Sequence, residues 1–368
     1  MMFNIAKVLA DIEADSDQNI DLLVDLLKIK SISTIPDYAD ECYQAAGWLK
    51  AFLDSFGMDA IIYESEGHPI VFSDYQTSRP EAKTILFYGH YDVQPVDPVS
   101  LWDSDPFDPV LSSIDNEPCI IARGASDDKG QLLTFLIALK YIKNEVGELP
   151  FSLKIILEGE EECGSKTLPI FLEDYKDKLS ADIAYVCDTG MWDKDTPAIT
   201  RSLRGLLSEE FKIIGPDRDL HSGEFGGVAW NPIRIITKIL SDVYDDEGKV
   251  TIPNFYDGVN EVNENIINSW KKLTFNETEY LNKIGQKSSS GETGRSIFEK
   301  TWSRPTFEIN GIFGGYTDEG TKTVIPSEAN AKLTCRLVGN QDPEKILENI
   351  HKYIKSSLPD GVQVIFGG

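Results

Sequence analysis

The sequence has few of the residues that define several large classes of protein. It contains 35 Lys and Arg against 61 Asp and Glu, a net charge of -26. Nucleic-acid-binding proteins usually present a basic face, and docking on anionic membranes also needs basic residues, so this balance argues against both functions. No apolar run approaches the ~18 residues that a membrane-spanning helix needs. With 41% hydrophobic and 26% charged residues, the composition is otherwise that of a soluble globular protein.

Cysteine and histidine are also scarce. The five cysteines are odd in number, are scattered and include no Cys-x-x-Cys pair, so reduced thiols are a simpler interpretation than a disulfide framework. The first twenty residues turn acidic almost at once and lack the basic start and apolar core of a secretory signal. These features predict a cytoplasmic protein. Because the chain has only four histidines, one that stands in a metal-ligand pattern is informative.

The 368 residues suffice for two domains. Up to about residue 199, segments with the apolar spacing of a helix alternate with short apolar runs typical of strands. The helical patterns cover residues 21–29, 41–56 and 131–146, and the strand-like segments cover 84–89, 119–126, 151–159 and 181–188. This alternation predicts an α/β domain over residues 1–199, with a mostly parallel, twisted sheet flanked by helices.

The pattern changes after residue 199. Residues 200–368 combine half-exposed strands with amphipathic helices and a polar loop, which predicts a second, smaller α+β domain. The strands are expected at 206–215, 329–338 and 361–368, the helices at 231–246 and 343–358, and the loop at 286–296.

Side chains that can bind metal follow the predicted strands of the first half. They are His90, Asp127, the pair Glu161 and Glu162, and Asp188. Ligands of such sheets lie outside the carboxyl ends of the strands, so four strand ends of one sheet are expected to bring these groups together. Each has an ordinary explanation alone, such as a surface histidine, an N-capping aspartate or a solvated helical turn. Four together are hard to attribute to chance.

The residue types also make chemical sense. Imidazole and carboxylate ligands suit zinc, with manganese or cobalt as alternatives. Asp92 can bind the second nitrogen of His90 and fix its tautomer. Of the adjacent Glu161 and Glu162, one can bind metal while the other acts as general base on a metal-bound water, whose pKa falls to roughly 7. Cations would also offset the repulsion among the four glutamates of residues 158–162.

The chain resembles the carnosinase, aminoacylase and succinyl-diaminopimelate desuccinylase superfamily of two-metal peptidases, and within it most closely the carnosinase-type dipeptidase branch. The resemblance runs in family order from about residue 20 to the C-terminus. It implies a metal-dependent hydrolase, a homodimer, that cleaves the amide bond of dipeptides or short peptides with a free C-terminal carboxylate. The matching stretches are "FYGHYDVQP", "ARGASDDKGQ", "LEGEEECGS", "YVCDTG", "DLHSGEFGGVAWNP", "RPTFEINGIFGGYTDEGTKTVIP" and "AKLTCRLV".

The resemblance also implies a role for each residue of the first half. His90 and Asp188 would bind one divalent metal, and Asp127 would bridge it to a second. Glu162 would bind the second metal, and Glu161 would be the general base. Two further expectations are that Asp92 orients His90 and that the 127–128 peptide bond is cis.

The second half is implied to be a lid and dimerisation domain. His221 would reach into the partner subunit's site and stabilise the oxyanion, and Thr323 would join it in contacting substrate. Arg336 would grip the C-terminal carboxylate of the substrate, for which a two-pronged guanidinium is suited. The ordinary alternatives are a surface histidine in a Ser-Gly turn and a solvent-facing arginine on a strand.

The match fails at one point. The family supplies one more histidine, the last ligand of the second metal, in a late segment that returns to the catalytic domain. This chain stops at "GVQVIFGG", and neither His68 nor His351 stands at that position, so the second site lacks its expected histidine. We expect a truncated piece with an incomplete catalytic domain; a natural short form with an impaired site is the alternative.

Two other functions stay open from the sequence. An amidohydrolase of N-acyl amino acids would use the same site, because its substrates also present an amide next to a free carboxylate. A non-catalytic dimeric binding protein, or an inactive truncated form, would account for the missing histidine.

Overall fold

The computed structural model describes residues 4–64, 66–114 and 116–367. The chain divides into two compact units, residues 1–199 and residues 200–368. Within the described ranges, no helix combines the length and the apolar character needed to cross a membrane. Each unit is described by itself.

The first unit is built on a five-stranded sheet in the order β1-β2-β6-β3-β7. β3 pairs in parallel with both β6 and β7, whereas β2 runs antiparallel to both of its neighbours. Four of the five strands therefore run in one direction, which confirms the mostly parallel sheet. The strands are β1 (Ile61–Tyr63), β2 (Ile70–Tyr75), β3 (Thr84–His90), β6 (Ser152–Glu158) and β7 (Ile183–Val186).

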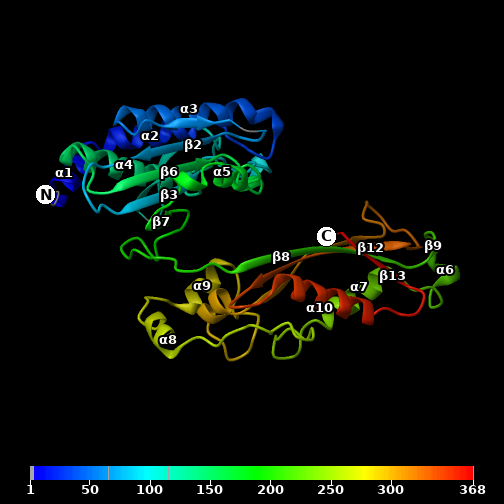
Figure 1. Cartoon of the computed structure of the whole chain (residues 1–368). Helices are drawn as coiled ribbons and strands as arrows, with labels where there is room; N and C mark the ends of the chain where they lie inside the picture. Colours follow the sequence, from blue (N-terminus) through cyan, green and yellow to red (C-terminus); the bar gives the residue numbers. More distant parts are fainter. Residues whose placement is uncertain (1–3, 65, 115, 368) are drawn as a thin grey trace. The chain divides into compact units, whose positions relative to one another are not determined.

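Helices cover this sheet, and Figure 1 shows α2 and α3 over one face. The main core lies there, between the sheet and the apolar sides of α2, α3 and α4. A smaller core lies on the opposite face, where α5 packs. The helices are α1 (Ile5–Ala14), α2 (Ser16–Leu27), α3 (Ala39–Ser55), α4 (Lys129–Val146) and α5 (Leu168–Asp174).

The central strand β6 shows why the sheet has two cores. All seven of its residues are buried, as expected of a strand covered on both faces. Because side chains alternate along a strand, Leu153, Ile155 and Leu157 join the main core while Ile156 joins the smaller one, beside Phe171 of α5. β6 is therefore held from both sides, and its carboxyl end is a rigid place from which to present the glutamates that follow.

The second unit contains a four-stranded antiparallel sheet in the order β10-β12-β8-β13 and a short β9-β11 ladder. The predicted strands and the loop are confirmed, and the predicted α+β character with them. The strands are β8 (Gly205–Ile214), β9 (Leu220–His221), β10 (Thr306–Gly314), β11 (Val324–Ile325), β12 (Glu328–Leu337) and β13 (Gln363–Phe366).

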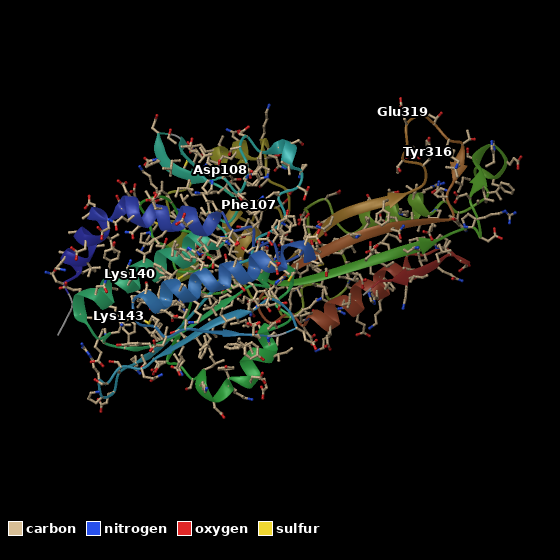
Figure 2. The ribbon with its side chains drawn as sticks, turned by 90° about the horizontal axis from the view of Figure 1, so that it is seen from above. Phe107, Asp108, Lys140, Lys143, Tyr316 and Glu319 are labelled. Carbon is tan, nitrogen blue, oxygen red and sulfur yellow. The ribbon has the colours of Figure 1, made fainter. Side chains whose placement is uncertain are left out.

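Two capped helices, α7 and α10, cover one face of this second sheet (Figure 1). Each starts with an Asn or Asp cap followed by proline, since Asn231 and Asp342 accept hydrogen bonds from backbone N–H groups of the first turn. The loop between β10 and β11 carries Tyr316, whose hydroxyl donates to the carbonyl of Glu319 at 2.9 Å (Figure 2). The helices are α6 (Ser222–Phe225), α7 (Pro232–Ser241), α8 (Glu264–Trp270), α9 (Glu277–Lys283) and α10 (Pro343–Ser356).

Candidate metal centre

His90 ends β3 and is fully buried at the carboxyl edge of the first sheet. Its Nε2 lies 3.1 Å from Oδ1 of Asp127 and 3.7 Å from Oδ2 of Asp188. One ligand atom from each of the three residues lies within 4.8 Å of the other two. One imidazole and two carboxylates converging on one point are a donor set that fits a divalent ion such as zinc. The structure thus brings together three of the predicted ligands.

Asp127 reaches this point by a route that differs from the expected one. We expected it to follow a strand of the same sheet, but the preceding strand, β5 (Glu117–Ile121), pairs among the described residues only with β4 (Val110–Ile114). Asp127 instead lies two residues before the start of α4. The peptide bond to Asp128 is cis, as the resemblance implied. The Asp128 carboxylate accepts a hydrogen bond from the backbone N–H of His90 at 3.1 Å, which ties the helix start to the end of β3.

Asp92 connects the metal centre to the glutamate turn. It is fully buried, and its Oδ1 lies 3.3 Å from Nδ1 of His90. Its two oxygens also accept hydrogen bonds from the backbone N–H groups of Glu161 and Glu162, at 3.2 and 3.0 Å. The hydroxyl of Ser33 donates to Oδ2 at 2.6 Å. One carboxylate thereby fixes the orientation of the imidazole and the position of both glutamates.

The glutamate cluster divides into an inward and an outward pair. Glu158 and Glu160 are buried. Glu160 accepts hydrogen bonds from the backbone N–H groups of His68 and Thr167, and Glu158 accepts from side-chain hydroxyls. The other two begin a short 3-10 helix, Glu161–Cys163. Of the four glutamates, only Glu161 and Glu162 can therefore take part in the metal centre.

Glu162 does not belong to the group of His90, Asp127 and Asp188, but it is close enough for the charge of Asp127 to affect it. Its Oε2 accepts a hydrogen bond from Nε2 of Gln94 at 2.7 Å. Partial burial raises the pKa of Glu162, and the charge of Asp127 raises it further. Burial is also the main cause of the raised pKa of Glu161 and of Asp188. Carboxylates with raised pKa values around one point favour a bound cation, because a cation removes their mutual repulsion.

Metal binding should release a proton from His90. Burial by itself lowers the pKa of His90, but the hydrogen bond to Asp92 and the surrounding carboxylates outweigh it and raise the pKa to about 10 in the metal-free protein. A ligating imidazole must be neutral, so zinc has to displace this proton below pH 10. We expect zinc affinity to rise by roughly tenfold per pH unit between pH 6 and 8. Calorimetry in buffers of different ionisation enthalpy measures the proton released; no proton released would contradict the assignment of His90.

The predicted residues of the second unit fall into two places. His221 ends β9 and Thr323 directly precedes β11, with Nε2 of His221 3.1 Å from Oγ1 of Thr323. Arg336 is exposed near the far end of β12, paired with Thr306 of β10. The segment that leads into His221 lies at the start of β12, because Asp219 accepts a hydrogen bond from the backbone N–H of Ser327 at 2.8 Å. From Glu328, where β12 starts, to Arg336 the strand extends ~26 Å. A dipeptide spans only about 7 Å, so the His221 pair and Arg336 of one chain cannot contact the same dipeptide.

The two remaining histidines lie elsewhere. Nε2 of His68 is 3.0 Å from the carbonyl oxygen of Ser33 in the first unit. In the second unit, His351 is paired with the buried carboxylate of Glu209 and its ring stacks on Phe366. Within the described ranges, neither belongs to a group of metal-type ligands.

Three supporting residues were missed from the sequence. Ser33 and Gln94 hold Asp92 and Glu162, and Lys129 is buried directly after the two aspartates. The only signal for Lys129 was its place in "ASDDKGQ", where a lysine at a helix start is unfavourable for the helix dipole. Ser33 had no signal, because it lies 59 residues from its partner in sequence.

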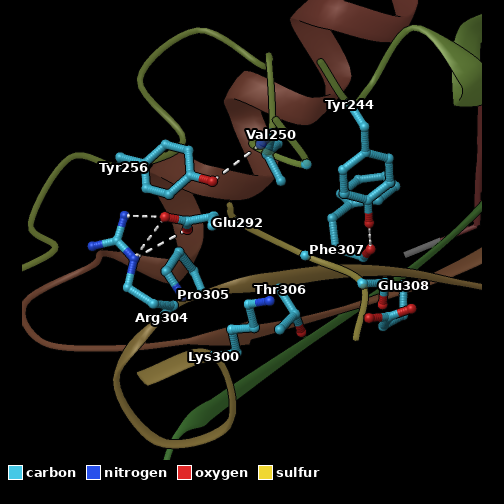
Figure 3. Close-up of a pocket in the computed structure, with 13 residues that line it drawn as sticks. Tyr244, Val250, Tyr256, Glu292, Lys300, Arg304, Pro305, Thr306, Phe307 and Glu308 are labelled. Atoms are coloured by element: carbon cyan, nitrogen blue, oxygen red, sulfur yellow. Dashed lines mark hydrogen bonds and ion pairs between the residues drawn. The ribbon is translucent and has the colours of Figure 1, made fainter. Parts of the chain in front are cut away.

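A cavity of about 360 Å³ lies in the second unit beside β10 (Figure 3). Three of its charged groups have partners within the protein: Arg304 contacts Glu292 at 2.9 Å, and Nζ of Lys300 donates to Oγ of Ser289 at 3.0 Å. None of the predicted site residues lines it.

Known proteins are similar to this chain in both sequence and fold. Residues 201–362 match the peptidase dimerisation domain. The chain is 32% identical over 289 residues to the Beta-Ala-His dipeptidase of Homo sapiens, covering 78% of this chain and 56% of that protein. It is 32% identical over 287 residues to the Cys-Gly metallodipeptidase of Saccharomyces cerevisiae, covering 77% and 59%. An M20 family metallo-carboxypeptidase from Sulfolobus solfataricus superposes with a TM-score of 0.80 at 35% identity, over 94% of this chain and 77% of that one.

These similarities define a metallopeptidase architecture of two units, of which the second matches a dimerisation domain. The chain belongs to the M20 family of metallopeptidases. The superfamily resemblance inferred from the motifs is thereby confirmed. The chain spans a little over half the length of the two curated relatives.

Proposed function

We propose that the protein is a metal-dependent hydrolase that cleaves the amide bond of dipeptides or short peptides with a free C-terminal carboxylate. The observation that carries this proposal is the convergence of His90, Asp127 and Asp188 next to the glutamate turn. The named activities of the two curated relatives, a Beta-Ala-His dipeptidase and a Cys-Gly metallodipeptidase, support the choice of substrate.

The metals are proposed to be a divalent pair, zinc first, with manganese or cobalt as alternatives. His90 and Asp188 would hold one ion, Asp127 would bridge, and Glu162 would contact the second. When bound, such ions make a water more acidic and stabilise negative charge on the substrate. Imidazole together with carboxylate is a typical zinc donor set, and that supports the first choice.

The general base is proposed to be Glu161. In the described part of the chain its carboxylate has no hydrogen-bond or ion-pair partner, while its backbone N–H is fixed by Asp92. Its raised pKa moves it towards the range useful for proton transfer near neutral pH. Glu161 would take a proton from the attacking water as the new C–O bond forms. It would then deliver that proton to the amine nitrogen as the C–N bond breaks.

The substrate contacts are proposed to come from two chains of a homodimer. Within one chain, His221 and Thr323 are too far from Arg336 to share a dipeptide. This conflict disappears in a dimer in which one chain supplies the His221 pair and the other supplies Arg336 together with the metal centre. The match of residues 201–362 to a peptidase dimerisation domain supports the arrangement. A cytoplasmic location is supported by five free cysteines in an acidic chain.

The proposal is tested by measuring zinc per chain after reconstitution and then hydrolysis of a matched panel. The panel pairs each dipeptide with the N-acyl amino acid that has the same C-terminal residue. We expect bound zinc and a higher kcat/KM on the dipeptides. A preference for the N-acyl amino acids would favour the amidohydrolase. Zinc binding without turnover of either class would favour a binding protein, and no bound zinc would contradict the metal centre itself.

A further inference from the structure

Lys129, the first residue of α4, is wholly buried, which is rare for a lysine. Its ammonium Nζ donates to the carbonyl oxygens of Leu26 at 3.1 Å and Ile29 at 2.7 Å. These carbonyls lie at and just beyond the end of α2. The last carbonyls of a helix lack donors within it, and a cation there is favoured by the helix dipole. The lysine thus joins the start of α4 to the end of α2.

The path of this side chain is fixed by close packing. Gly124 has φ +82°, and a Cβ at that position would lie 2.9 Å from Cγ1 of Val93 and 3.3 Å from Cδ of Lys129. The stem of the lysine therefore passes next to a backbone that carries no side chain. It has little freedom to reach other acceptors.

The residues after α2 extend this connection to the metal centre. The hydroxyl of Ser31 donates to the carbonyl of Tyr91 at 2.7 Å, and the backbone N–H of Val93 donates to the carbonyl of Ser31 at 2.9 Å. Ser33 then donates to the Asp92 carboxylate, which contacts His90. The segment of residues 26–33 is thus bonded at one end to Lys129 and at the other to the chain that orients His90.

We propose that Lys129 is a positioning residue of the metal centre. Asp127 lies two residues before it, and His90 lies at the other end of the connection through residues 26–33. By holding the start of α4 against this segment, Lys129 sets the distance between the Asp127 carboxylate and the His90 imidazole, which is 3.1 Å here. The inference rests on the metal centre of the proposed function.

The direction in which zinc affinity changes when Lys129 is replaced distinguishes a positioning role from an effect of its charge. A buried cation close to a metal site repels the metal, so removing it would tighten zinc binding if charge were its only influence. Loss of positioning would weaken zinc binding, because the ligands would no longer be held at the required distances. A purely structural role would lower the stability of the metal-free protein and leave zinc affinity unchanged.

Lys143 provides a matched control on the same helix. It lies near the other end of α4 (Figure 2), and its Nζ donates to the carbonyl of Phe56, just after α3, at 2.7 Å. It too joins α4 to the end of a packed helix, but it is far along the helix from Asp127. Lys129→Met and Lys143→Met each keep the aliphatic stem and remove the donor.

The experiment measures zinc dissociation constants by competition with a chelator, on the 368-residue chain. We expect Lys129→Met to raise the dissociation constant by about 10–100-fold and Lys143→Met to leave it unchanged. The thermal unfolding midpoints of the zinc-free variants show how much each substitution lowers the stability of the protein. An unchanged or tighter constant for Lys129→Met would overturn the inference.

Two further measurements keep the result decisive. If Lys129→Met does not fold, Ser31→Ala removes the next bond of the connection without removing a buried charge. A raised zinc dissociation constant for Ser31→Ala supports the inference, and an unchanged one overturns it. If the unaltered chain binds no zinc, both the metal centre and this inference fail, whereas normal binding in every variant removes the inference alone.

Discussion

Glu161→Gln is expected to lower kcat for dipeptide hydrolysis by about 10²–10⁴-fold, the usual contribution of a general base. Glutamine keeps the size and the backbone contact of Glu161 with Asp92 but cannot take a proton from water. Because Glu161 is separate from the group of His90, Asp127 and Asp188, zinc content should stay as in the unaltered protein. Steady-state kinetics and metal analysis of the same preparation measure both.

A matched control for this substitution is Glu173→Gln. Glu173 is an exposed glutamate of α5 whose carboxylate lies 3.4 Å from Nζ of Lys176. We expect it to change neither kcat nor zinc content. Activity in Glu161→Gln above about a tenth of the original would rule out the general-base role, because this is less than the smallest effect such a role predicts. Loss of zinc in that variant would instead make Glu161 a ligand.

Mixing two inactive variants is expected to restore hydrolysis. Loss of an oxyanion donor costs about 10²–10³-fold, so His221→Ala should be nearly inactive by itself, like Glu161→Gln. In a mixed dimer, the chain with intact Glu161 can receive His221 from its partner, which gives one competent site out of two. Random exchange of equal amounts makes half of the dimers mixed, so roughly a quarter of the original activity should return.

This experiment separates sharing of the site from mere dimerisation. If His221 acted on the catalytic unit of its own chain, each chain would carry one defect and mixing would restore nothing. Size-exclusion chromatography with two differently tagged variants shows whether mixed dimers form. Mixed dimers that remain inactive would contradict the two-chain site, and the conflict between His221 and Arg336 would then need another explanation.

The comparison of sequence and structure is clearest at the metal centre. His90 ends β3 and Asp188 follows β7, and these parallel strands present their carboxyl ends at one edge, so local patterns were enough to predict that the two residues meet. Asp127 was predicted to join them for a partly wrong reason. β5 lies outside the main sheet, and the start of α4 brings Asp127 to the centre. Apolar periodicity identifies a strand but not the sheet it enters.

The sequence by itself determined the fold class, the family and the residues able to bind metal, because motifs and apolar periods are local and survive without knowledge of the fold. Only the tertiary structure decided how those residues are held. Ser33, 59 residues from Asp92, and Lys129, 100 residues from Ile29, act through contacts that no local pattern encodes. The separation of His221 from Arg336 was likewise invisible, since it depends on the pairing of β9 with β11 and on the place of Arg336 along β12. Long-range hydrogen bonds and strand register are properties of the folded chain, and they decide the geometry on which the chemistry depends.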